Sequence, residues 1–347
     1  MKRPTIADIA RRAGVSTGAV SYALNGQPGV SETTRARILA IAEEVGWQPN
    51  SAARALSAAR VNTVGLAVAR APSVLGIEPF FMQLISGIEA ALSDHGTALL
   101  LQVVPDRTAE TAAHRRWWGE RRVDGVIIID LEQDDPRVDA LVEMELPAVV
   151  IGGPSPRPRL TEVFSDEAAA TRVLMDYLAA LGHRRIAHVS GPTRLLHTAT
   201  RIGSCRDAAR RHGLESAESY ETDYTGEAAA RVTRDLLAGT DRPTAIIYDN
   251  DVMAVAAVAV TQEMGLRIPQ DISLAAWEDS PLCQLVHPPL TTLHRDVMAY
   301  GTHAAEQLLA TIDDGARRSF QDATAYLVPR GSTAQPSDRA TGTTAPN

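Results

Sequence analysis

Charged side chains are distributed unevenly along this chain of 347 residues, and their distribution is the first indication of its chemistry. Residues 1–60 contain eight Lys and Arg but only four Asp and Glu, which gives this segment a formal charge of +4. The remaining residues carry −12, so the net charge of the whole chain is −8. A basic segment on an acidic body indicates that the segment binds a polyanion, which the body avoids.

Residue types that support catalysis or metal binding form no recognisable motif. The carboxylates and histidines make no nucleophile elbow, no metal-ligand cluster and no paired acid and base. The two cysteines, Cys205 and Cys283, are too few and too far apart for a disulfide framework or a zinc site, which fits a reducing compartment. We therefore expect no enzymatic activity, no catalytic residues, no cofactor and no metal.

Three short helices are predicted to present the basic segment. Thr5 begins the first helix, with Asp8 three residues later as in a capping box. Ser16 caps the second helix, which follows a break at 13–15, and Ser31 caps the third. Two short helices joined by a tight glycine turn are typical of a helix-turn-helix. On the helix pattern alone, a generic helical hairpin remains an equal alternative to a DNA-binding unit.

A short linker is predicted after Pro49. Residues 50–57 favour a helix of only about two turns, and isolated helices of that length are marginal in water. We therefore expect the linker to become ordered only when something packs against it.

The body, from Asn62 onward, alternates short apolar runs with longer amphipathic segments, which is the pattern of parallel sheets flanked by helices. Buried strands are predicted at 64–69, 98–104, 126–129, 148–151, 186–190, 245–248 and 273–276. Helices are predicted at 81–93, 167–181 and 252–265. A proline-rich break at 152–159 is predicted to divide the body into two similar lobes, whose ligand would bind in the cleft between them.

Four segments follow from these patterns. The head is predicted at 1–48, the linker at 49–61, the two-lobed body at 62–332 and a disordered tail at 333–347. The tail is rich in Ser, Thr, Pro, Ala and Gly and has no large apolar side chain to bury in a core.

The chain resembles the lactose-repressor/galactose-repressor (LacI/GalR) family from residue 5 to about 333. In the head the resemblance rests on 5–10, 13–16, 20–21, 24–26, 30–31 and 49–50. In the body it rests on 79–81, 181–186, 250–254, 289–292 and 330–333. It implies an all-α helix-turn-helix head followed by an α/β, periplasmic-binding-protein-like (type I) effector domain with parallel sheets.

The resemblance also implies which head residues contact DNA, because the family places its second helix in the major groove. Thr17, Gly18 and Tyr22 occupy base-reading positions, while Ser16 and Ser21 are expected to contact phosphates. Gly18 has no side chain, and Tyr22 stands where the family often has arginine, which argues against bidentate recognition of guanine there. A phosphate or packing role for Tyr22 remains an equal alternative. The full set of predicted DNA contacts is Thr5, Ser16, Thr17, Gly18, Ser21, Tyr22, Asn25, Asn50, Ala53 and Leu56.

Leu56 matches the apolar side chain that the family inserts into the minor groove. Such a wedge unstacks the central base step and kinks the duplex. A linker helix that forms or melts in response to small changes in the body would act as a switch.

By the same resemblance, the effector cleft is lined by Phe80, Asp166, Arg201, Asn250, Trp277 and Glu278. Aromatic faces can cover the C–H face of a sugar, and the polar groups can bond its hydroxyls. Asp166 could instead cap the following helix, and Arg201 could be a solvated helix residue. For His197, in a loop near the cleft, we expect a solvated side chain.

We therefore predict a cytoplasmic homodimeric repressor of sugar-utilisation genes. Its partners would be double-stranded, roughly palindromic operator DNA and a mono- or disaccharide effector. The sequence has no apolar signal-peptide core and no membrane-spanning run, which argues against a periplasmic sugar-binding protein and against a membrane partner. A purine- or nucleoside-type, corepressor-dependent regulator of the same family is the alternative.

Overall fold

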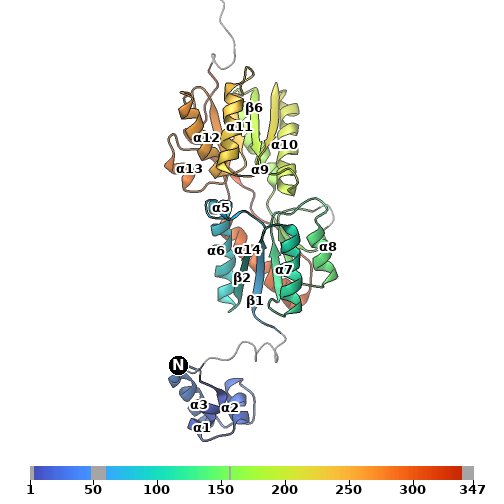
Figure 1. The fold of residues 1–347 in the computed structure, drawn as a ribbon, viewed down its shortest axis with the longest axis vertical. Coiled ribbons are helices and arrows are strands. Elements are labelled where there is room, and N and C mark those ends of the chain that lie inside the picture. Colours follow the sequence, from blue (N-terminus) through green and yellow to red (C-terminus); the bar gives the residue numbers. More distant parts are fainter. Residues whose placement is uncertain (1–3, 48–59, 156–157, 338–347) are drawn as a thin grey trace, which may run out of the picture. The chain divides into compact units, whose positions relative to one another are not determined.

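A computed structural model describes residues 4–47, 60–155 and 158–337 of the chain (Figure 1). It divides into two compact units, Met1–Val61 and Asn62–Asn347. Within the described residues, no helix has both the length and the apolar character needed to cross a membrane.

The head consists of α1 (Ile6–Ala13), α2 (Thr17–Leu24) and α3 (Glu32–Glu44). The three predicted caps are confirmed: Thr5 forms a capping box with Asp8, and Ser16 and Ser31 each accept a hydrogen bond from a backbone N–H of the following first turn. Gly14 ends α1 with a φ of 65°, a left-handed conformation that glycine adopts without a Cβ clash. The chain can therefore turn sharply into α2.

One small apolar core holds the three helices of the head together. Its centre is Ile9, Val20 and Ile38, one from each helix and none of them exposed. Arg35 of α3 donates to the carbonyls of Ala23 at 3.1 Å and Gln27 at 2.7 Å, which fixes the end of α2.

The first lobe is built on a six-stranded parallel sheet in the order β11-β5-β4-β3-β1-β2. Its strands are β1 (Thr63–Val68), β2 (Ala98–Val103), β3 (Gly125–Ile128), β4 (Ala148–Ile151), β5 (Thr161–Phe164) and β11 (Ser319–Gln321). Its helices are α5 (Pro72–Leu75), α6 (Pro79–Asp94), α7 (Arg107–Gly119), α8 (Pro136–Glu143) and α14 (Val297–Asp314).

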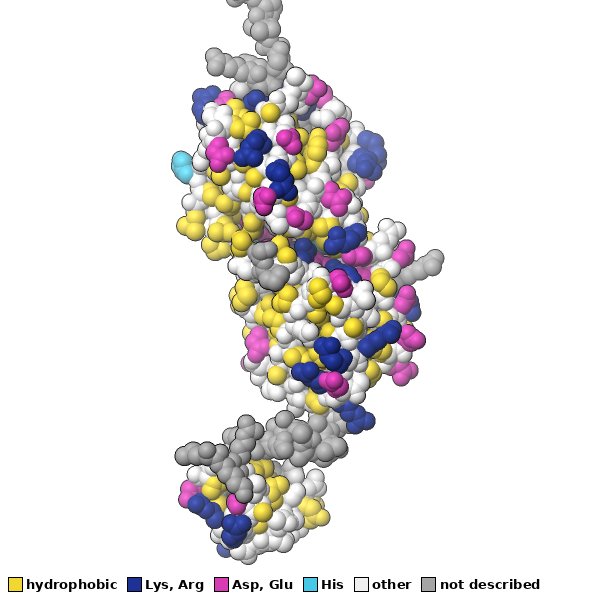
Figure 2. Space-filling model, viewed as in Figure 1, with side chains coloured by type: hydrophobic (Ala, Val, Ile, Leu, Met, Phe, Trp, Pro, Cys, Tyr) yellow, Lys and Arg dark blue, Asp and Glu magenta, His cyan; other side chains and the backbone are white. Residues whose placement is uncertain are grey.

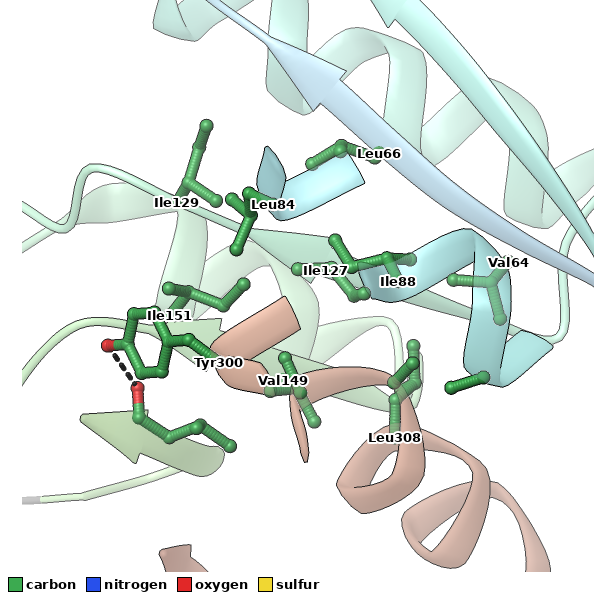
Figure 3. Close-up of a cluster of buried hydrophobic side chains, with 14 of the residues drawn as sticks. Val64, Leu66, Leu84, Ile88, Ile127, Ile129, Val149, Ile151, Tyr300 and Leu308 are labelled. Atoms are coloured by element: carbon green, nitrogen blue, oxygen red, sulfur yellow. Dashed lines mark hydrogen bonds between the residues drawn. The ribbon is translucent and has the colours of Figure 1, made fainter. Parts of the chain in front are cut away.

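Helices cover both faces of this sheet. On one face, Leu84 and Ile88 of α6 and Leu308 of α14 pack on strand residues such as Ile127 (Figure 3). On the other face, α7 and α8 bury a second apolar cluster that includes Trp117. The central strands β1, β3 and β4 are thus covered on both faces, which is why they are continuous apolar runs.

The helices α6 and α14 approach each other closely because glycines stand at their contact. A Cβ on Gly87 would lie 1.9 Å from the carbonyl oxygen of Met298, and one on Gly301 would lie 2.3 Å from that of Leu84. Any side chain at either glycine would force the two helices apart.

The second lobe has the strand order β12-β10-β9-β8-β6-β7, with only the edge strand β12 antiparallel. Its strands are β6 (Arg185–Ser190), β7 (Ser216–Glu221), β8 (Ala245–Tyr248), β9 (Ser273–Trp277), β10 (Thr291–His294) and β12 (Tyr326–Val328). Its helices are α9 (Glu167–Ala180), α10 (Leu196–His212), α11 (Gly226–Ala238), α12 (Asp251–Glu263) and α13 (Leu282–Leu285).

The two lobes are interleaved in sequence, so the predicted division at 152–159 is wrong. The strand after that break, β5, still belongs to the first sheet. The chain passes to the second lobe after β5, returns after β10 to build α14 and β11, and leaves again to build β12. The prediction failed because a proline-rich loop between two strands of one sheet has the same composition as a linker between two lobes.

The predicted disordered tail begins too early at Thr333. The hydroxyl of Thr333 lies 2.8 Å from those of Tyr177 and Thr291. The backbone N–H of Ala334 donates to Ser273 Oγ at 3.1 Å. These residues satisfy polar groups of the second lobe, a role that composition does not reveal.

Candidate functional site

A cleft between the two lobes collects the ends of strands from both sheets. Arg70 and Asp130 follow β1 and β3 of the first lobe, and Asp249 and Glu278 follow β8 and β9 of the second. Arg295 follows β10, where the chain crosses back to the first lobe. The carboxyl ends of parallel strands are where ligands bind in such sheets. In Figure 2, side chains of both charges lie close together where the lobes meet.

Three residues of the cleft other than glycine have a left-handed backbone. The φ values are 55° for Asp130, 70° for Tyr224 and 65° for Glu278. This conformation is unfavourable for residues other than glycine, and such strain is concentrated at functional sites.

Arg201, from α10, is the centre of a buried ion-pair network. Its side chain donates to Glu167 Oε2 at 2.8 Å and lies 3.2 Å from Asp249 Oδ1. Its guanidinium also stacks 3.7 Å from the centre of the Trp277 ring. Since only 3% of Arg201 is exposed, the alternative of a solvated helix residue is wrong. Burial would raise the pKa of Glu167, but Arg201 and Arg295 hold that pKa below its usual value.

Arg295 connects carboxylates of the same network. It donates to Glu167 Oε1 at 3.3 Å and to both carboxylate oxygens of Glu278. Its guanidinium also lies over the rings of Phe80 and Tyr300, 5.2 and 5.3 Å from their centres. Glu278 is therefore held in place by a basic partner.

On the first lobe, Arg70 pairs with Asp130 at 2.7 Å. The same guanidinium lies 4.7 Å from the ring centre of Tyr224 in the second lobe. Burial opposes ionisation of Asp130, but Arg70 holds its pKa well below the usual range. Asp130 is therefore a fixed negative charge in the cleft.

Three of the six predicted effector residues line this cleft: Phe80, Arg201 and Glu278. Trp277 lies beneath Arg201. Asp166 accepts from the backbone N–H of Ala169 at 2.8 Å and so caps α9, as the alternative interpretation proposed.

Asn250, the sixth predicted effector residue, also caps a helix. Its Oδ1 accepts from the backbone N–H of Met253 at 2.8 Å, at the start of α12. Its Nδ2 donates across the interface between the lobes to Glu78 Oε1 at 3.5 Å, and within its own lobe to the carbonyl of Tyr224 at 3.3 Å. Asn250 therefore acts at the margin of the cleft.

The expectation that His197 is solvated is wrong. His197 lines the cleft, and its Nε2 lies 2.7 Å from the hydroxyl of Tyr224. Burial, reinforced by the positive charge of Arg201, lowers its pKa to about 4. Its ring is therefore neutral at physiological pH.

Several cleft residues were absent from the sequence-based prediction: Arg70, Glu78, Asp130, Glu167, Tyr224, Asp249 and Arg295. Three of them had a usable signal. Arg70, Asp130 and Asp249 directly follow predicted strands, the same position that favoured Asn250 and Glu278. Nothing in the local sequence indicated the others.

The head exposes most of the residues that were predicted to contact DNA. Thr5, Ser16, Thr17, Gly18, Tyr22 and Asn25 are exposed, and Ser21 is half-buried. Tyr22 is 52% exposed on α2. The predicted linker contacts Asn50, Ala53 and Leu56 lie outside the described residues, so their roles stay predictions.

Two family models match the chain. Residues 5–50 match the model described as bacterial regulatory proteins, lacI family. Residues 175–333 match a periplasmic binding protein-like domain.

The sequences of two relatives match this chain over most of its length. The HTH-type transcriptional regulator CelR of Thermobifida fusca is 31% identical over 318 residues, which cover 90% of this chain and 92% of CelR. The HTH-type transcriptional repressor PurR of Photobacterium profundum is 30% identical, with coverage of 89% and 92%.

Solved structures of such regulators are similar to this chain as well. A complex of the regulator CelR with cellobiose has 29% identity and a TM-score of 0.71, and covers 95% of this chain and 100% of that one. The Lac repressor dimer bound to operator and the anti-inducer ONPF has 26% identity and a TM-score of 0.85, with coverage of 96% and 100%. The chain therefore belongs to the lacI family of bacterial transcriptional regulators.

Proposed function

We propose that this protein is a cytoplasmic repressor that binds operator DNA as a homodimer and responds to a small sugar in the cleft. The observation that carries the proposal is the convergence of charged strand-end residues from both lobes, including Asp130, Arg201 and Glu278, on one cleft. A ligand there touches both lobes, so its affinity depends on how the lobes are arranged. Such a ligand shifts the equilibrium between two arrangements by its difference in affinity for them.

The chemistry of the cleft favours a sugar over a purine. Its carboxylates and guanidiniums are acceptors and donors suited to the many hydroxyls around a sugar ring. The complex of CelR with cellobiose shows that a relative of this chain binds a disaccharide.

The head supports the DNA-binding part of the proposal. Its second helix leaves Thr17, at its N-terminus, and Tyr22, one turn further on, exposed, and the residues near the N-terminus of such a helix read base edges in the major groove. A dimer matches a two-fold operator because each head covers only one half-site.

Two measurements test the proposal on the full-length protein. Selection from a random duplex library should enrich a roughly palindromic sequence, whose affinity falls steeply with salt. A thermal-shift screen with cellobiose, D-glucose, D-galactose, hypoxanthine and guanine should then identify the effector class. Stabilisation by purines alone would replace the sugar by the purine alternative, and failure to enrich any sequence would refute specific DNA binding.

The last step links the two sites. Adding the sugar that stabilises the protein should change its affinity for the selected duplex, because the two ligands bias the same equilibrium. An affinity that is the same with and without the sugar would refute control by that sugar.

A further inference from the structure

Glu78, the residue before α6, differs from every other carboxylate that lines the cleft. Asp130, Glu167, Asp249 and Glu278 each form an ion pair with an Arg or His. Among the described residues, Glu78 has no such partner within ion-pair distance, although it is only 9% exposed.

The hydrogen bonding of Glu78 is incomplete as well. Its Oε1 accepts one long bond, 3.5 Å, from Asn250 Nδ2. Its Oε2 is buried and has no hydrogen-bond partner within the described parts of the chain. The side chain also does not cap α6, although the residue occupies the N-cap position.

A buried carboxyl oxygen without a partner is unfavourable for folding, so its presence needs another reason. Burial raises the pKa of Glu78 to about 7, although the charge of Arg70 opposes this rise. The other charged groups that act on it are Asp130 and Asp251, both acidic. The carboxyl group is thus poised between its neutral and its ionised form at physiological pH.

We propose that Glu78 determines the specificity of the effector site, because its Oε2 accepts a hydrogen bond from a donor group of the effector. The donor is a hydroxyl or an ammonium group, since both bond a carboxylate. The inference rests on the proposed effector cleft and adds the group in it that selects the ligand. Because Asn250 of the second lobe also bonds Glu78, a donor held there lies between the two lobes.

The first test needs no ligand. In the full-length protein, Glu78→Met replaces an unsatisfied buried carboxyl with an apolar chain of similar length, so the melting temperature should rise. Glu89→Met, on the exposed face of the same helix, is the control and should change it little. A lower melting temperature for both Glu78→Met and Glu78→Gln would show that the carboxyl supports the fold, and would overturn the proposal.

The second test measures binding by calorimetry. The probes are D-glucose, D-glucosamine, D-galactose, D-galactosamine, cellobiose and hypoxanthine, titrated into the wild type, Glu78→Met, Glu78→Gln and Glu89→Met. Any probe that binds the wild type should bind Glu78→Met at least tenfold more weakly and bind Glu89→Met unchanged. Equal affinity for the wild type and Glu78→Met would overturn the proposal.

The choice of probes distinguishes an ammonium donor from a hydroxyl donor, and it distinguishes failure of the sugar proposal from failure of the inference about Glu78. An ammonium donor makes an amino sugar bind more tightly than its parent sugar, with a preference that Glu78→Gln removes. A hydroxyl donor leaves the parent sugar at least as tight. If hypoxanthine alone binds and needs Glu78, the inference stands and the sugar proposal fails. If no probe binds the wild type, the sugar proposal fails, and a melting temperature of Glu78→Met that is not raised overturns the inference too.

Discussion

Arg201→Ala should destabilise the two-lobed unit, because it leaves two carboxylates in the interior with fewer partners. Removing one member of a buried ion pair costs about 3–5 kcal/mol. Here the cost should be near the lower limit, since Glu167 keeps Arg295 and Asp249 keeps His188. At about 2–4 °C per kcal/mol for a unit of this size, the melting temperature should fall by roughly 6–12 °C.

Circular dichroism of the full-length protein during heating measures this change. Arg206→Ala is the matched control, because Arg206 is exposed on the same helix, and its effect should stay within about 0.5 kcal/mol. The double variant Arg201→Met with Glu167→Gln should recover part of the loss, since it removes charge of both signs together. A melting temperature within 2 °C of the wild type for Arg201→Ala, an interval of at most about 1 kcal/mol, would refute the network as a source of stability.

Three further predictions concern other parts of the molecule. Burial lowers the pKa of His114 and of His183 to about 4, below the usual 6.5 of the unfolded chain. Each histidine therefore contributes folding stability above pH 6.5 that is lost as the pH falls towards 4, and thermal melting at pH 7 and 5.5 should show a loss of about 1.4 kcal/mol per histidine. If His114→Gln loses as much stability between these pH values as the wild type, the prediction for His114 is wrong. Gly87→Ala should cost at least about 2 kcal/mol in thermal melting because its Cβ meets a backbone carbonyl 1.9 Å away, whereas Gly119→Ala, with no atom within 4 Å, should cost nothing. Tyr22→Ala should weaken binding to the selected duplex about tenfold in fluorescence anisotropy without changing the melting of the head, because Tyr22 is 52% exposed. Unchanged affinity would refute a DNA contact, and a lowered melting temperature would assign Tyr22 to packing.

The local parts of the fold were predictable because their causes are local. The caps Thr5, Ser16 and Ser31 each act within one helical turn, so the sequence around them is sufficient. The central strands were predictable as well, because burial on both faces makes each of them a continuous apolar run that the sequence shows directly. By contrast, the edge strands β7 and β11 are mostly polar and β12 has only three residues, so their pairing with a neighbour is what defines them.

The site was only partly predictable because its geometry is not local. Position after a strand correctly indicated Glu278, and would have indicated Arg70, Asp130 and Asp249. The ion pair of Arg201 with Glu167 joins residues 34 positions apart, and periodicity carries no information about such a pair. Asp166 and Asn250 were ambiguous for a different reason. A polar side chain directly before a helix can either cap the helix or contact a ligand, and the sequence is the same in both cases.

The contact of α6 with α14 joins segments made at very different times during synthesis. Gly87 and Met298 touch across more than two hundred residues of sequence. At about 5–20 residues per second, α6 leaves the ribosome roughly 10–40 s before its partner helix exists. During that time Leu84 and Ile88, fully buried in the finished protein, have no α14 to cover them. The first lobe therefore cannot finish folding until most of the second has been translated, and the nascent chain should depend on chaperones that shield this apolar face.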